Sequence, residues 1–147
     1  MIIRSIGVAA LLASALGVGA ALAGDVGGRP FYTALTGAAE VPTPGDPDGA
    51  GTAKITINPG HQKVCWELTA TGIAPATMAH IHVGGVGVGG GIAVMLSPPS
   101  DGASSGCVED EDAAAILANP DGYFVNVHNA DFPAGALRGQ LSAKKAK

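Results

Sequence analysis

The sequence has few aromatic and few charged residues. Of its 147 residues, 4% are aromatic and 14% are charged, whereas 23 are glycine and 10 are proline. Such frequent glycine and proline would interrupt long helices but suit the turns between short strands, which argues against an all-helical bundle. The formal charge is −4 and no basic run precedes the last four residues. Because phosphate backbones are bound through clustered positive charge, we expect no nucleic-acid partner.

Long apolar runs are confined to the first part of the chain. Arg4 precedes an uncharged stretch from Ile6 to Leu22, which ends in the small-residue pattern Ala21-Leu22-Ala23. This pattern predicts a signal peptide over residues 1–23, an uncleaved membrane anchor being the alternative. A single domain over 24–147, with its core at 29–143, would then follow. We expect this domain to be secreted or periplasmic, without stable membrane insertion after cleavage of the signal.

Cysteine is scarce, with Cys65 and Cys107 as the two in the chain. An exported domain passes through an oxidising compartment, where two cysteines commonly pair. We therefore predict a Cys65–Cys107 disulfide. The alternative is a pair of buried free thiols.

Alternating apolar and polar residues predict most of the strands. The alternation is clearest over Thr52–Ile57 and Lys63–Thr71, which a short turn joins into a hairpin. Residues 98–106 are polar and predict a loop, and Glu109–Leu117 predicts the one helix, with an acidic first turn. The other predicted strands are Phe31–Leu35, Met78–Val83, Ile92–Leu96, Tyr123–Asn129 and Ala136–Ser142. The expected fold is all-β, an antiparallel Greek-key β-sandwich of about 7–8 short strands with one short helix.

Several short segments, spread over nearly all of the chain that follows the predicted signal peptide, match one family together. The matching segments are Leu35-Thr36-Gly37, Glu40-Val41-Pro42, Ala79-His80-Ile81-His82, Tyr123–His128 and Pro133–Leu141. In this order they resemble the CHRD (chordin-type) domain. The resemblance implies a domain that occurs in the extracellular protein chordin and, alone, in exported bacterial proteins.

Three of the four histidines form a candidate metal site. His80 and His82 are two apart on a predicted strand, so their rings leave the same face. His128 lies on another predicted strand, on the face opposite Tyr123, Val125 and Val127. Imidazole nitrogens are ligands for copper and zinc, so these three residues predict a copper or zinc site. The alternative is that the rings are polar residues that hold loops in place, since no Cys, Met or acidic fourth ligand is evident.

Three classes of function remain open at the level of the sequence. The first, which we favour, is an extracytoplasmic binding or structural module whose partner is a protein or a glycan. The second is a copper- or zinc-binding protein. The third is a metalloenzyme, which would need an acid or base beside the metal. No catalytic residue is predicted, and His61, in a predicted turn, is expected to be exposed.

Overall fold

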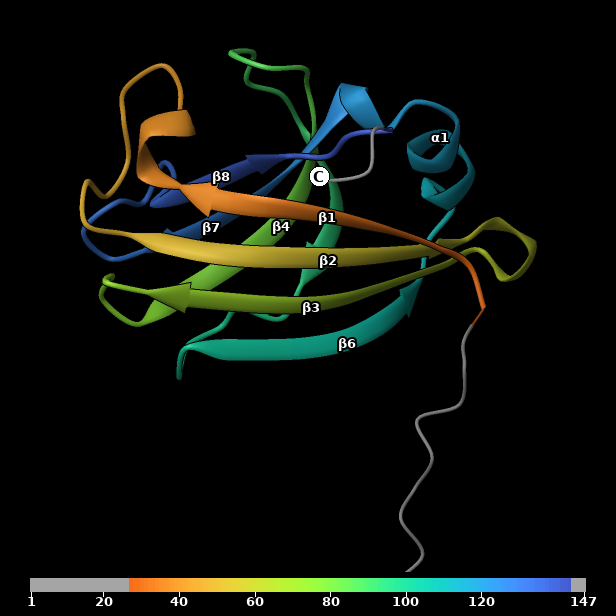
Figure 1. Ribbon diagram of the computed structural model, residues 1–147, viewed down its shortest axis with the longest axis horizontal. Helices are drawn as coiled ribbons and strands as arrows, with labels where there is room; N and C mark the ends of the chain where they lie inside the picture. Colours follow the sequence, from red (N-terminus) through yellow and green to blue (C-terminus); the bar gives the residue numbers. More distant parts are fainter. Residues whose placement is uncertain (1–26, 144–147) are drawn as a thin grey trace, which may run out of the picture.

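The computed structural model describes residues 27–143, so the predicted signal peptide and its cleavage site lie outside the described residues. Within that range, eight antiparallel strands form one sheet in the order β5-β4-β7-β8-β1-β2-β3-β6. The sheet folds over itself, so that β1, β2, β3 and β6 form one layer and β4, β7 and β8 lie in the layer behind (Figure 1). This barrel-like sandwich confirms the predicted fold class.

The strands are short and the helices shorter. The strands are β1 (Arg29–Thr36), β2 (Ala50–Asn58), β3 (Lys63–Thr71), β4 (Ala76–Val83), β5 (Ile92–Leu96), β6 (Ala103–Glu109), β7 (Tyr123–Asn129) and β8 (Leu137–Gln140). The α-helix is α1 (Ala113–Ala118), and the 3-10 turns are η1 (Gly37–Ala39), η2 (Pro59–His61) and η3 (Pro120–Gly122). None of the helices in the described range is long and apolar enough to cross a membrane.

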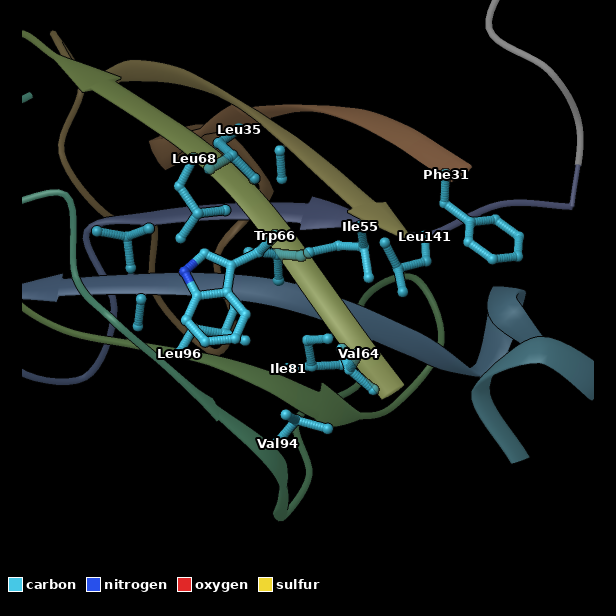
Figure 2. Close-up of a cluster of buried hydrophobic side chains, with 14 of the residues drawn as sticks. Phe31, Leu35, Ile55, Val64, Trp66, Leu68, Ile81, Val94, Leu96 and Leu141 are labelled. Atoms are coloured by element: carbon cyan, nitrogen blue, oxygen red, sulfur yellow. The ribbon is translucent and has the colours of Figure 1, made fainter. Parts of the chain in front are cut away.

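The core lies between the two layers. On β2 and β3, the apolar residues of the alternating pattern are buried, including Ile55, Trp66 and Leu68. Figure 2 shows these side chains in one buried cluster with Ile81 from β4 and Val94 from β5. Burial of alternate residues explains why the two-residue period is so regular on these strands, because each strand has one face in the core and one outside. The outer faces are therefore free to carry polar side chains.

Two predicted elements were placed wrongly. Residues 98–106 do not form a loop throughout, because Ala103–Glu109 is strand β6, paired along β3. Its Ala-Ser-Ser-Gly start has weak strand propensity, and pairing with β3 overrides it. The helix begins at Ala113 rather than Glu109, with Asp112 as its N-cap residue and no acid in its first turn. Ala113 and Ile116 are its buried positions, so packing rather than the acidic run fixes its length.

The disulfide joins the edge strand β6 to its neighbour. Cys65 and Cys107 are directly opposite in the β3–β6 register, and their sulfurs are bonded at 2.11 Å. The predicted pairing is thus confirmed, and the alternative of two free thiols is excluded. The bond closes a loop over a sequence separation of 42 residues that contains β4 and β5.

Close packing of Gly106 against Trp66 is a second feature of the β3–β6 pair. Gly106 lies directly opposite Trp66, and a Cβ at Gly106 would lie 2.5 Å from Cζ2 of the indole. We expect Gly106→Val to displace the indole and to lower the free energy of unfolding by about 1–3 kcal/mol, the usual cost of overpacking. Ser105→Val is the control, because Ser105 is exposed on the other face of the strand. Urea unfolding that shows equal stability for the two variants would contradict this role of Gly106.

Candidate metal centre

Strands β4 and β7 bring the three predicted histidines together. His80 and His82 lie on the outer face of β4, and the antiparallel register places them opposite Asn126 and Phe124 of β7. His128 lies two residues beyond Asn126 on the same face of β7. One ring nitrogen from each histidine lies within 4.8 Å of the other two. Strand pairing, rather than closeness in sequence, therefore creates this cluster.

Backbone carbonyl groups orient two of the rings. His82 Nδ1 is 3.0 Å from the Gly90 oxygen, and His128 Nδ1 is 3.1 Å from the Pro133 oxygen. A carbonyl oxygen only accepts, so each Nδ1 carries the proton and each neutral ring has its lone pair on Nε2. Metal-binding histidines commonly use one nitrogen for the metal and donate from the other to a carbonyl or carboxylate. These two rings donate from Nδ1 in this way and keep a lone pair on Nε2.

The remaining ring links the cluster internally. His80 Nδ1 lies 3.1 Å from His128 Nε2. Because His128 Nε2 holds a lone pair, His80 Nδ1 donates its proton to it when no metal is present. In its other tautomer, His80 carries the proton on Nε2 and Nδ1 has a lone pair. The three rings can then direct three lone pairs, from His80 Nδ1, His82 Nε2 and His128 Nε2, at one ion.

His82 Nε2 is a buried acceptor without a partner. Among the described residues it is one of two buried side-chain nitrogen or oxygen atoms with no hydrogen bond, the other being Trp66 Nε1. A buried polar atom without a partner costs about 1–3 kcal/mol, so such an atom in a native protein needs an explanation. A metal ion bound at the cluster would use this lone pair. The hypothesis that the histidines only hold loops in place gives His82 Nε2 no role.

Burial keeps the rings of His80 and His128 neutral. Their exposed fractions are 3% and 7%. Desolvation, and then the nearby His128 and His82 rings, lower the pKa of His80 from 6.5 to about 4. Desolvation also lowers the pKa of His128, against the hydrogen bond to Pro133, which raises it. At neutral pH both rings are therefore neutral, which is the state that a metal requires.

The aromatic ring of Phe124 supports His82 from β7. The two rings stack, with centroids 5.0 Å apart and planes at 7°. The guanidinium carbon of Arg138 lies 3.5 Å from the centroid of the Phe124 ring. Arg138 also donates to the carbonyl oxygens of Gly85 and Val88, at 2.7 and 2.9 Å. Arg138 thereby fastens the loop of residues 84–91, whose Gly90 oxygen orients His82.

Sequence reasoning did not identify these supporting residues. Phe124 and Arg138 stand out only when β7 and β8 are paired and the glycine-rich loop is folded back over them. The fourth histidine, His61, is exposed in η2, as predicted, and does not belong to the cluster. The prediction of three convergent histidines was possible because two of them share a strand face.

A buried carboxyl group lies next to the cluster. Glu40 is 6% exposed and accepts a hydrogen bond from Asn126 Nδ2, and Asn126 is the β7 partner of His80. Desolvation raises the pKa of Glu40 from 4.5 to about 7, although the charge of Arg138 lowers it. The folded protein therefore binds this proton more tightly than the unfolded chain does. Stability is lost as the pH rises from about 4.5 through 7.

Glu40 and His80 act in opposite directions on stability. The lowered pKa of His80 contributes stability above pH 6.5, which is lost as the pH falls towards 4. We expect Glu40→Gln, measured with a chelator present, to raise the free energy of unfolding at pH 8 by on the order of 3 kcal/mol. The glutamine amide oxygen still accepts the hydrogen bond from Asn126. Without the opposing contribution of Glu40, the loss of stability that His80 causes below pH 6.5 should become steeper. Urea unfolding at pH 5 and 8 checks this, and parallel pH profiles for the variant and the parent would contradict it.

Comparison with known proteins gives one match. The family model described as the CHRD domain matches residues 31–141. This range contains the three histidines, the disulfide and all eight strands apart from the first two residues of β1. Neither the curated proteins nor the solved structures gave a match.

Proposed function

The chain belongs to the CHRD domain family, and we propose that its domain binds one copper or zinc ion through His80, His82 and His128. The observation that carries the proposal is the unpartnered lone pair of the buried His82 Nε2 within the three-histidine cluster. Three imidazole ligands are a common protein contribution to zinc and copper sites, and a fourth position remains for another ligand. In this proposal the domain is an extracytoplasmic metal-binding module.

Equilibrium dialysis of the full chain against zinc and against copper(II) tests the proposal. At neutral pH we expect one equivalent of either metal, retained against washing with metal-free buffer. Retention by the parent and loss in a His80→Ala, His128→Ala double variant would support the site. A parent protein that retains no metal would overturn the proposal. The histidines would then be structural, in a module that recognises a protein or a glycan by other residues.

The glycine-rich loop gives a second test, away from the ligands. A Cβ on Gly90 would collide with the carbonyl oxygen of Val83, whereas a Cβ on Gly89 would meet nothing within 4 Å. Gly90→Ala should move the Gly90 carbonyl from His82 and weaken metal affinity by about 10- to 100-fold, as is typical for partners that orient a ligand. Gly89→Ala is the matched control and should bind as the parent does. Equal affinities in a competition titration would show that the Gly90 carbonyl does not position His82.

A further inference from the structure

Two exposed methionines flank the histidine cluster. In the described range, the methionines are Met78 and Met95, with exposed fractions of 44% and 61%. Met78 is the register partner of His128 in the β4–β7 pair, and Met95 is the register partner of His80 in the β4–β5 pair. Directly opposite residues of antiparallel strands share a face, with Cβ atoms about 5 Å apart. Each thioether therefore belongs to the same outer face as the histidine beside it.

The two methionines do not belong to the core packing. The core of this layer is formed by the alternate residues, such as Ala79, Ile81 and Val94, which are buried. Met78 and Met95 point away from that core. On this outer face they are largely exposed, so hydrophobic burial contributes little at their positions. Methionine is long and unbranched, so its sulfur can adapt to a neighbouring ion. The two residues thus put soft donor atoms on the outer face that carries the cluster, beside His80 and His128 in the strand register.

The chemistry of the donors distinguishes between metals. Thioether sulfur is a soft ligand that favours Cu(I), whereas zinc sites in proteins use thiolate, imidazole and carboxylate. The cysteines do not provide thiolate, because both are in the disulfide between β3 and β6. The nearby carboxyl group of Glu40 accepts a hydrogen bond from Asn126 and is not among the three groups that converge at the cluster. A site with imidazole and thioether donors and no thiolate should therefore prefer copper in its reduced form.

We propose that Met78 and Met95 supply thioether sulfur to the ion held by His80, His82 and His128, so that the site binds Cu(I) in preference to Zn(II). This inference rests on the proposed three-histidine site and specifies its metal. The bond is a dative one from the sulfur lone pair, so no electron is transferred when Cu(I) binds. His80 gives up its proton on Nδ1 and takes one on Nε2, so the ring stays neutral.

The test compares two metals on the full chain and on a Met78→Leu, Met95→Leu double variant. Cu(I) is supplied without oxygen and competed with a chromophoric Cu(I) chelator, and Zn(II) is competed with a zinc chelator. We expect the double variant to lose at least about tenfold in Cu(I) affinity, equivalent to about 1.4 kcal/mol, with little change in Zn(II) affinity. Ile92→Leu is the matched control, because Ile92 is exposed opposite His82 on β5 and has no sulfur.

X-ray absorption of the Cu(I)-loaded parent provides a readout that does not depend on a variant's folding. We expect it to show a sulfur scatterer at the copper. If the parent binds neither metal, the three-histidine site itself is overturned. If it binds both metals, and copper shows nitrogen but no sulfur neighbours, the histidine site stands and the thioether ligands are overturned. Equal Cu(I) affinity in the parent and the folded double variant would also overturn the thioether ligands.

Discussion

Replacing His82 with alanine is expected to reduce affinity for copper or zinc by at least about 100-fold, equivalent to about 2.7 kcal/mol. His82 Nε2 is buried, has no hydrogen-bond partner within residues 27–143, and belongs to a ring that the Gly90 carbonyl and Phe124 hold in place. Alanine removes this ligand and leaves two histidines for the ion. The affinity is measured by competition with a chelator of known strength.

His61→Ala is the matched control for His82. His61 is exposed in η2 and outside the cluster, so this variant should bind the metal as the parent does. Because His82 lies on the partly exposed side of the cluster, its loss should leave the core residues of β4 in place. Circular dichroism would verify that both variants are folded. If His82→Ala and His61→Ala had equal effects, the metal would be held at the surface and not by this cluster.

The second large effect is expected from the disulfide. Replacing both Cys65 and Cys107 with serine should lower the free energy of unfolding by about 4 kcal/mol, because the bond closes a long loop in the unfolded chain. The bond also fixes β6, an edge strand that β3 alone pairs. Such a loss is a large fraction of the stability of a small domain. Urea unfolding of the oxidised parent and of the double variant measures it.

Reduction of the parent protein is the control for the double serine variant. The reduced parent should unfold at nearly the same urea concentration as the variant, because both lack the covalent link. A variant as stable as the oxidised parent would show that the pairing of β3 and β6 is sufficient without the bond. A variant much less stable than the reduced parent would show that the serine hydroxyls, rather than the missing bond, cause the loss.

The sequence predicted the strands well where one face is buried. The alternation over residues 52–57 and 63–71 identified the inward residues correctly, because burial imposes a period of two. The sequence-based prediction failed at β6, because serine and glycine have little strand propensity there. The long-range pairing with β3 decides the conformation of this strand. It also placed the helix start too early, because an acidic run near a helix does not show which residue caps it.

The candidate site could be predicted only in part. His80 and His82 share a face because of their spacing, which the sequence contains. Their approach to His128 depends on the pairing of β4 with β7, whose residues are far apart in the chain. The roles of the Gly90 and Pro133 carbonyls depend on loop conformation, and those of the two methionines on strand register. Neither the loop conformations nor the strand register has a local signal in the sequence.

Anomalous diffraction tests the central claim most directly. Crystals of the full chain grown with zinc or copper would be measured above and below the absorption edge of that metal. The proposal predicts one anomalous peak on the outer face of β4 and β7, from an ion bonded to nitrogen atoms of His80, His82 and His128. Fully loaded crystals with no peak among these three rings, or with a peak only at His61 or another surface residue, would contradict the proposed metal site.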